Sequence, residues 1–517
     1  MKELRKQAAA RQRRIILNND GNEVVYRCEQ VTDQEAMAEE ILRHHTSPLQ
    51  GSQVDTIFYC DWSSGFGLFT HQSNIAEVFT TKEGIFEHNV TADLIAAGTD
   101  PLEIMVDYCH QSGIEIFWSM RMNDVHDGQV QDGELYYPQL FPQFKKDHPE
   151  YLFGSQGQRL PGVGESRAWS AVDYGQDEVR ERAFAIIEDV CRRYEIHGIE
   201  LDFFRHCLFF REVAYGEPLT QKHLDKMTEL LQRVRGMADE VGASRQRPIL
   251  IAVRVPDSLD YCSAVGLDLE TWLAQDLFDL LIPSGYFQLN PWEYSVELGH
   301  SYGVRVYPCL SESRVQGRPD AEWQDDIRNQ TECMRARAIN IWNSGADGVY
   351  LFNYHHIFTP TASIWRELGD PETLQPLEKV YHVTVRGHRA VTSYLRDGEE
   401  FINVPTLSPD HPVELTAGEA AETTLACGED LEAAMEKGLK PGLRLRVCVE
   451  DLDKASHLHV SLNGQPQGDG TLADGWLEFA PAPTQLQRGD NDMALQLAPD
   501  AGPPVTIKDL QLWVTYD

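Results

Sequence analysis

The sequence predicts an α/β protein: a (β/α)8 TIM-type barrel followed by a C-terminal antiparallel β-sandwich. Two observations carry this prediction. Between residues 13 and 375, short and nearly continuous apolar runs alternate with segments whose apolar residues recur at helical spacing, which is typical of parallel strands separated by helices. From residue 376 onward, apolar and polar residues alternate with period two between Gly, Pro and Asp turns, which is typical of antiparallel strands.

The first part of the chain holds the predicted strands of the barrel. They read, in order, RRIILNND (13–20), TIFYCDW (56–62), GIEIFWSMR (113–121), GIELDFFRH (198–206), ILIAVRV (249–255), FDLLIPSG (278–285), VRVYPCL (304–310) and DGVYLFNYHH (347–356). Amphipathic stretches such as TDQEAMAEEILRHH and DEVRERAFAIIEDVCRRY lie between them and are expected to be helices. Eight such units close naturally into a barrel.

The second part of the chain holds the predicted sandwich. Its alternating segments are YHVTVRG, LRLRVCVEDL, HLHVSLNGQ, DNDMALQLA and IKDLQLWVTY. We therefore expect an N-terminal arm at 1–12, frayed or helical, the barrel at 13–375 and the sandwich at 376–517. A module that packs or dimerises is the more ordinary use of such a sandwich, with sugar binding as the alternative.

The charge balance limits the classes of partner. The chain has 45 Lys and Arg against 81 Asp and Glu, a formal net charge of −36, which repels nucleic-acid phosphates and anionic membranes. No apolar run reaches the roughly 18 residues of a membrane span. The first apolar run is only Ile15 to Leu17, shorter than the roughly 7 to 15 residues of a secretory signal. We expect a soluble, cytoplasmic protein with no nucleic-acid or membrane partner; an anionic substrate would need locally placed arginines.

The ten cysteines are scattered and form no C-x-x-C pair. This spacing fits neither a zinc site nor a disulfide framework. Several cysteines fall inside apolar strand-like runs, where a free thiol acts as a small hydrophobe. We therefore expect free thiols in a reducing compartment.

The carboxyl ends of barrel strands are where the chemistry of such folds is found. The polar residues that end the predicted strands are Asn18, Asp20, Asp61, Arg121, Asn123, His126, Glu200, Asp202, Arg205, His206, Arg254, Asp257, Glu312, Asn353, His355 and His356. The connection at 122–175 has no sustained periodicity, and a loop of that length in a compact domain is usually functional. Aromatic residues gather near the same positions, including Trp62, Trp118 and Tyr286; sugar faces stack on such rings, although each ring alone is more simply a core residue.

One interpretation of these residues is a carboxylate pair. Asp202 on the fourth strand and Glu312 after the seventh would serve as the two carboxyl groups of a glycosidase acting on a neutral sugar. The alternative is that Asp202 forms an ion pair with Arg205 that orients the pocket. Both interpretations stay open on the sequence alone.

Four motifs taken in order carry a family resemblance. RRIILNNDGN at the first strand, SMRMNDVHD after the third, GIELDFFRH on the fourth and LFNYHH on the eighth resemble the inverting exo-sialidases of glycoside hydrolase family 156. The resemblance implies hydrolysis of terminal α-linked sialic acids by single displacement, without metal or organic cofactor, in a homodimer. Matched by motif, it makes Asp20 the base and His126 the Brønsted acid. It makes Arg121, Arg205 and Asn353 candidate ligands of the substrate carboxylate. We also place Asp202 in the substrate-binding set.

The implied pairing agrees with the chemistry of a sialoside. Its anomeric carbon carries a carboxylate, so a carboxylate nucleophile would be repelled, and an aspartate that deprotonates a water avoids this contact. The pKa of histidine lies close to neutral pH, so a small upward shift would keep its side chain protonated and able to donate a proton. Arginine holds a carboxylate by two parallel hydrogen bonds.

Each assignment has a structural alternative. Asp20 before Gly21 is a common turn pair, His126 in a loop is by default solvated, and Arg121 could be a buried partner of Asp124 or Asp202. Three functions therefore stand: the sialidase, a neutral-sugar glycosidase using Asp202 and Glu312, and a carbohydrate-binding protein without catalytic activity.

Overall fold

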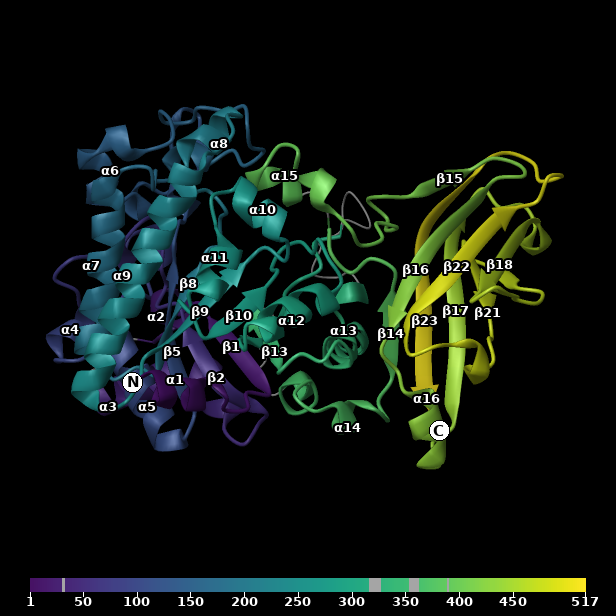
Figure 1. The fold of residues 1–517 in the computed structure, drawn as a ribbon, viewed down its shortest axis with the longest axis horizontal. Helices are drawn as coiled ribbons and strands as arrows, with labels where there is room; N and C mark the ends of the chain where they lie inside the picture. The colour runs from purple at the N-terminus through teal and green to yellow at the C-terminus, as the bar shows by residue number, and fades with distance from the viewer. Residues whose placement is uncertain (30–32, 316–326, 353–361, 388–389) are drawn as a thin grey trace. The chain divides into compact units, whose positions relative to one another are not determined.

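The computed structural model describes residues 1–29, 33–315, 327–352, 362–387 and 390–517 (Figure 1). The chain divides into two compact units. One comprises Met1–Cys309, Asp347–Trp365 and Arg389–Ile402, and the other Leu310–Ala346, Arg366–His388 and Asn403–Asp517. The first unit contains nearly all of the nine-stranded parallel sheet, and the second contains the two larger antiparallel sheets.

The parallel sheet has nine strands, and every pairing described between them is parallel. Their bounds are β1 Ile15–Asn19, β2 Val54–Tyr59, β5 Glu115–Arg121, β8 Gly198–Asp202, β9 Leu250–Val255, β10 Leu280–Pro283, β11 Arg305–Val306, β12 Cys309–Leu310 and β13 Val349–Phe352. The spatial order is β11-β10-β9-β8-β5-β2-β1-β13-β12.

The two end strands of this order, β11 and β12, are consecutive pieces of one segment. They are separated at Tyr307 and Pro308, where proline has no N–H to give to the ladder. Tyr307 N–H donates to Leu281 of β10 at 2.9 Å, and Tyr350 N–H of β13 donates to Pro308 at 3.1 Å. Hydrogen bonding therefore passes from β10 through this segment to β13, which is the arrangement of a TIM-like α/β barrel. The predicted parallel, barrel-type sheet is confirmed.

Helices follow the strands of this unit. Their bounds are α1 Lys2–Ala9, α2 Asn22–Tyr26, α3 Gln34–His45, α4 Thr91–Ala96, α5 Pro101–Ser112, α6 Gln143–Asp147, α7 Asp177–Arg193, α8 Arg211–Tyr215, α9 Gln221–Arg245, α10 Leu259–Ala264, α11 Leu269–Ala274, α12 Trp292–Ser301 and α15 Val391–Tyr394. The long helices α7 and α9 lie side by side (Figure 1). The N-terminal arm forms α1, and its Arg5 is buried and ion-paired with Asp276 and Asp279.

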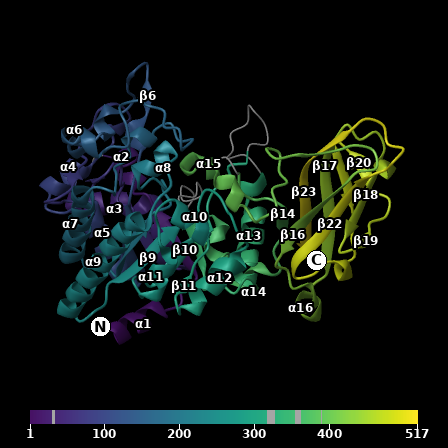
Figure 2. The ribbon, with the colours of Figure 1, turned by 45° about the horizontal axis from the view of Figure 1, so that its top comes forward.

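The long loop after β5 contains a small hairpin, β6 Val130–Gln131 with β7 Glu134–Leu135. Figure 2 shows it projecting at the top of the barrel. A second short pair, β3 Leu68–Phe69 with β4 Glu77–Val78, follows β2.

Aromatic rings fill the barrel interior. The Phe58 and Phe117 rings stack at 4.5 Å, and Tyr350 packs edge-on against Phe58 at 5.6 Å. Glu200 lies among them and accepts hydrogen bonds from the hydroxyls of Ser119 and Tyr350. Burial, together with the charge of a neighbouring carboxylate, raises the pKa of Glu200 to about 7. This part of the barrel is packed core and not an open channel.

The second unit holds two antiparallel sheets. One comprises β14 Lys379–His382, β15 Val413–Leu415, β17 Pro441–Glu450, β20 Thr471–Ala473, β21 Trp476–Phe479 and β23 Val505–Tyr516, and the other comprises β16 Ala420–Cys427, β18 Leu458–Leu462, β19 Gln465–Pro466 and β22 Gly489–Leu497 (Figure 2). Leu445, Leu425 and Leu495 from the two sheets belong to one buried cluster, so the alternating pattern produces a sandwich as predicted. Three α-helices also belong to this unit: α13 Thr331–Asn343, α14 Pro371–Leu374 and α16 Leu431–Glu436.

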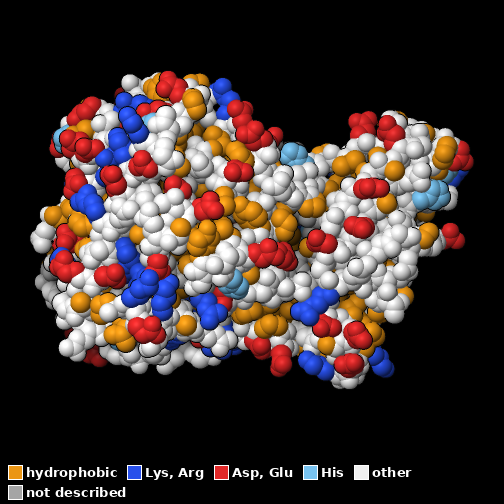
Figure 3. Space-filling model, in the orientation of Figure 1, with side chains coloured by type: hydrophobic (Ala, Val, Ile, Leu, Met, Phe, Trp, Pro, Cys, Tyr) orange, Lys and Arg blue, Asp and Glu red, His pale blue; other side chains and the backbone are white. Residues whose placement is uncertain are grey.

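All ten cysteines are free thiols, nine of them buried and Cys448 half-buried, as the sequence predicts. Acidic side chains are spread over the face of the molecule in Figure 3 and do not gather in one patch. Among the described residues, no helix has both the length and the apolar character needed to cross a bilayer.

Candidate active site

Asp20 follows β1 and stands at the carboxyl end of the barrel. The backbone remains extended to this point, since Trp62 N–H donates to the Asp20 carbonyl at 2.7 Å. Gly21 then turns with φ +74, and a Cβ there would lie 2.9 Å from Trp62 N, so the turn requires glycine. The Asp20 side chain is buried, with Oδ1 2.8 Å from Arg121 Nη2. The turn therefore sets the carboxylate at the rim, and the turn and site interpretations of Asp20 are compatible.

Arg121 ends β5 and connects two carboxylates. Its Nη2 faces Asp20, and its Nη1 donates to Ser63 O at 2.7 Å and to Asp124 Oδ2 at 3.3 Å. Burial by itself would lower the pKa of Arg121, but the Asp20 and Asp124 charges outweigh it and raise the pKa well above its usual value. Of the two structural partners that the sequence suggests for Arg121, Asp124 and Asp202, the structure shows Asp124.

His126 lies in the loop after β5, at the start of a 3-10 turn, His126–Gly128. Its Nδ1 is 2.9 and 2.8 Å from the two oxygens of Asp124, which also accepts the His126 backbone N–H at 3.0 Å. Asp124 is fully buried; although burial alone would raise its pKa, His126 and Arg121 hold it well below the usual range. An ionised carboxylate on Nδ1 fixes the tautomer that carries its proton there.

Arg205 contacts the other nitrogen of the same ring. Its Nη2 is 2.7 Å from His126 Nε2, and because a guanidinium can only donate, Nε2 is the acceptor. The half-buried position of the ring lowers the pKa of His126 to about 4; Asp124 opposes this effect and Arg205 adds to it. The expectation that His126 is protonated near neutrality is therefore wrong for the unliganded site, because a cation occupies its lone pair.

His206 completes this cluster. Its ring lies 5.2 Å from that of His126 and 6.1 Å from that of Tyr394, and its Nδ1 is 3.9 Å from Asp124 Oδ2. The His206 side chain is buried, and burial lowers its pKa well below the usual value. His206 therefore packs as a neutral ring behind His126.

Within the part of the chain that the structure describes, two groups of side chains have the spacing of metal ligands: Asp124, His126 and His206, and separately Cys28, Glu40 and His44. In the first group, Arg121 and Arg205 already bond the carboxylate and the Nε2 nitrogen. Their positive charges oppose a bound dication. We therefore assign no metal to this group.

Asp202 ends β8 and is engaged on both oxygens. Oδ1 accepts the backbone N–H groups of Phe204 and Arg205, each at 2.9 Å. Arg254, its neighbour in register on β9, donates to Oδ1 at 3.0 Å and to Oδ2 at 2.7 Å. The predicted Asp202–Arg205 ion pair is wrong, because Arg254 supplies the guanidinium and Arg205 only its amide. This engagement disfavours Asp202 as a substrate ligand or as a glycosidase carboxylate. Its suggested partner Glu312 follows β12 and is buried.

Several other predicted rim residues fasten loops. Asp61 accepts hydrogen bonds from the Thr70 hydroxyl and from His71. Asn123 donates to the carbonyls of Val172 and Leu208. Asp257 accepts from the backbone amides of Leu289 and Asn290. The predicted ligand Asn353, with His355 and His356, lies outside the described residues.

Some buried polar atoms near Asp20 have no hydrogen-bond partner within the described chain. These atoms are the side-chain oxygen and nitrogen of Asn18, Oδ1 of Asp20 and Nε of Arg121. Asp20 Oδ1 is ion-paired with Arg121, but the pair does not have hydrogen-bond alignment. Asn18 is 1% exposed and shares the register of Phe58 and Phe352, so it faces the barrel interior. An unpaired buried group costs about 1–3 kcal/mol, so Asn18, unpaired within the described residues, is a candidate contact for a water or a substrate atom. In the sequence, Asn18 is a candidate site residue because it lies two residues before Asp20 at the end of the first predicted strand.

The aromatic candidates divide between site and core. Tyr286 lies under Arg205, with the guanidinium carbon 5.4 Å from the ring centroid, a favourable cation–π distance. Trp62 stacks on Phe79 at 4.1 Å and Trp118 is fully buried. Tyr286 is therefore the aromatic residue of the three that belongs to the site.

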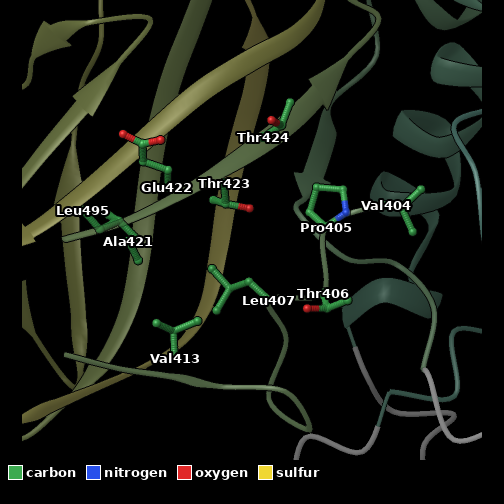
Figure 4. A pocket seen from close by; sticks show the side chains of 10 residues that line it. All are labelled: Val404, Pro405, Thr406, Leu407, Val413, Ala421, Glu422, Thr423, Thr424 and Leu495. Atoms are coloured by element: carbon green, nitrogen blue, oxygen red, sulfur yellow. The ribbon is translucent and has the colours of Figure 1, made fainter. Parts of the chain in front are cut away.

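A separate hollow of about 300 Å³ lies in the second unit. It is lined by Val404, Pro405, Thr406, Leu407, Val413, Ala421, Glu422, Thr423, Thr424 and Leu495 (Figure 4). Glu422 is the one ionisable side chain among these residues. The hollow contains none of the residues that the motifs single out.

Comparison with known proteins gives similarities only among solved structures. No family model and no curated protein matches the chain. The glycoside hydrolase domain of PgaB from Bordetella bronchiseptica matches at 12% identity over 70% of this chain and 99% of that one, with a TM-score of 0.44. A cycloisomaltooligosaccharide glucanotransferase from Paenibacillus sp. matches at 9% identity over 97% of this chain and 57% of that one, TM-score 0.34. The GH36 alpha-galactosidase AgaA from Geobacillus stearothermophilus matches at 11% identity over 96% and 58%, TM-score 0.35. The chain thus spans less than two thirds of the last two proteins, and none of these similarities identifies a substrate.

Proposed function

We propose that the protein is a glycoside hydrolase, an exo-sialidase that releases terminal α-linked sialic acids with inversion of configuration. One observation supports this proposal above the others. Asp20, Arg121, Asp124, His126 and Arg205 form one continuous series of contacts at the carboxyl end of the barrel. A candidate base, a candidate acid and a cation for an anionic sugar therefore belong to one site.

Arg205 is the better placed of the two arginines to bind a carboxylate. Arg121 is committed to Asp20, Ser63 and Asp124. Among the described residues, the contacts given for the Arg205 guanidinium are those with the neutral His126 imidazole and the Tyr286 ring. A carboxylate offers a bidentate, charge-assisted partner, which is stronger than either contact. In this proposal Arg205 binds the substrate anion and Arg121 orients the Asp20 side chain.

The reaction is a single displacement by water. Asp20 accepts a proton from a water as its oxygen attacks the anomeric carbon, on the face opposite the leaving oxygen. The bond to the leaving oxygen breaks, and His126 gives that oxygen the Nε2 proton. Asp124 stabilises the imidazolium that exists before this transfer. The water keeps the Asp20 carboxylate away from the carboxylate of the sugar, and the steps use only protein groups and water.

Hydrolysis of an aryl α-sialoside tests the assignment. Asp20→Asn and His126→Gln should each lose roughly 10²- to 10⁴-fold in kcat while retaining the circular dichroism and melting temperature of the wild type. Asp177→Asn and His148→Gln make the same chemical changes at exposed positions and should be fully active. Wild-type turnover in Asp20→Asn or His126→Gln would remove that residue from the mechanism.

Two further observations bear on the proposal as a whole. Proton NMR should show the β anomer as the first sugar released, and initial release of the α anomer would exclude inversion. If a broad panel of aryl glycosides shows no turnover while sugars raise the melting temperature, the protein is a carbohydrate-binding protein. The homodimer is part of the proposal and is tested by light scattering of the full chain.

A further inference from the structure

The Nε2 atom of His126, which would carry the catalytic proton, is bonded to the Arg205 guanidinium. In the described site, His126 Nδ1–H donates a hydrogen bond to Asp124, and Arg205 Nη2 lies 2.7 Å from Nε2. The lone pair that would have to be protonated for catalysis is therefore occupied by an N–H of Arg205. As it stands, this arrangement holds the acid in its inactive, neutral form.

We propose that Arg205 determines specificity by coupling the substrate's negative charge to the protonation of His126. In the empty site Arg205 blocks Nε2; a carboxylate on the sugar draws the guanidinium away, and Nε2 then takes a proton. The inference rests on the proposed function and adds to it the reason why an anionic substrate is required.

The exchange follows from the bonding capacity of each group. A guanidinium has five N–H donors in a planar fork that matches a carboxylate, whereas imidazole offers it one neutral lone pair. The His126 side chain is 31% exposed, so solvent can supply the proton once Nε2 is released. The bound substrate anion and Asp124 both favour the imidazolium that forms.

The proton count closes over one turnover. One proton enters from solvent at Nε2 and leaves with the released alcohol. Asp20 takes one proton from the attacking water and returns it to solvent. When the product leaves, Arg205 bonds Nε2 again and the site is reset.

Other charged and titratable groups face His126 besides Arg205. They are Asp124 and Arg121 in and beside its own loop, His206 next to Arg205, and the ion pair of Glu165 with Arg167 from the later part of the long loop. Glu165 and Arg167 largely offset each other, and His206 is neutral. Within the described residues, Arg205 is the one cation of this set that bonds the His126 ring. Its displacement therefore has the largest effect on the protonation of His126.

The coupling can be measured without any hydrolysis. Nitrogen NMR of the histidine rings of the full-length protein, with the His126 signal assigned by its loss in His126→Gln, distinguishes a bare from a protonated Nε2. The probe is sodium formate, the smallest carboxylate, compared with sodium chloride at equal ionic strength over pH 4 to 8. In the wild type, formate should raise the pKa of His126 by about one unit or more, a tenfold change in protonation.

Arg205→Gln should show the raised pKa in chloride alone and should not respond to formate. Arg233→Gln removes an exposed guanidinium on α9 and should behave as the wild type. The inference is overturned if formate leaves the wild-type His126 unchanged, or if wild type and Arg205→Gln titrate alike. A protein that cleaves no sialoside but shows the formate response would refute the proposed substrate while keeping the coupling.

Kinetics give a second, independent measurement. If Arg205 only bound substrate, Arg205→Gln would mainly raise KM for the aryl sialoside. If it also controls the acid, the variant should in addition hydrolyse the neutral amide of the sialoside faster than the wild type does, because Nε2 can then be protonated without an anion. A change confined to KM would refute control of the acid.

Discussion

Asp124→Asn is predicted to disable the acid without removing it. At an effective dielectric of about 20, an imidazolium and a carboxylate about 4 Å apart attract by about 4 kcal/mol. Asparagine keeps a neutral hydrogen bond worth about 1 kcal/mol. Because Asp124 is fully buried and 2.8 Å from His126 Nδ1, solvent screens little of this attraction. The loss should be about 3 kcal/mol, or roughly 10²-fold in kcat/KM.

The assay is initial-rate hydrolysis of an aryl sialoside at several pH values. Arg121 keeps Asp20 as a partner in this variant, so the protein should remain folded, and thermal melting checks this. Asp173→Asn is the matched control, since Asp173 is a buried carboxylate of the same long loop that accepts the Gly175 amide at 2.9 Å. If folded Asp124→Asn has the kcat/KM of the wild type, Asp124 neither stabilises the His126 imidazolium nor holds the tautomer with its proton on Nδ1.

Three other perturbations have definite expected outcomes. Asp202→Asn breaks the buried pair with Arg254 and should lower stability by about 3–5 kcal/mol; an unchanged melting temperature would contradict the structural role given to Asp202. Asn18→Leu should leave the melting temperature unchanged or higher but reduce turnover roughly tenfold, the effect of one lost hydrogen bond; full activity would mean that Asn18 binds neither water nor substrate. His126 has a folded-state pKa of about 4 against 6.5 unfolded, so the unfolded chain binds more protons between these values and stability is lost as pH falls from about 6.5 toward 4. Urea unfolding at pH 7 and pH 5 should therefore show a smaller loss in His126→Gln than in the wild type, and an equal loss would contradict the lowered pKa.

The barrel strands could be predicted because parallel strands buried on both faces read as apolar runs. The interruption of the seventh strand was harder to predict from the sequence, although Pro308 lies within VRVYPCL. A proline removes one ladder hydrogen bond, but whether that divides the strand depends on which neighbour needs the missing N–H. The alternation after residue 376 predicted the sandwich because one face of each strand packs on a shared core.

The position of the candidate site could also be predicted in part. The carboxyl ends of barrel strands share one rim. Arg121 ends β5, whereas Asp20 and Arg205 follow the ends of β1 and β8. Their partners could not be predicted. Sequence proximity suggested that Asp202 pairs with Arg205, whereas the register of β8 and β9 brings Arg254 to Asp202 and leaves the Arg205 side chain for His126.

The charge state of His126 could not be predicted for the same reason. It depends on groups from separate segments of the chain, Asp124 on one ring nitrogen and Arg205 on the other. A motif identifies the residue type and its position in a loop. It does not identify the group that occupies its lone pair.

A crystal structure of the protein soaked with N-acetylneuraminic acid tests the central claim most directly. The account predicts the sugar carboxylate on the Arg205 guanidinium, the anomeric carbon between Asp20 and His126, and Nε2 of His126 no longer bonded to Arg205. A sugar bound elsewhere, or bound with the Arg205–His126 contact intact, would contradict it.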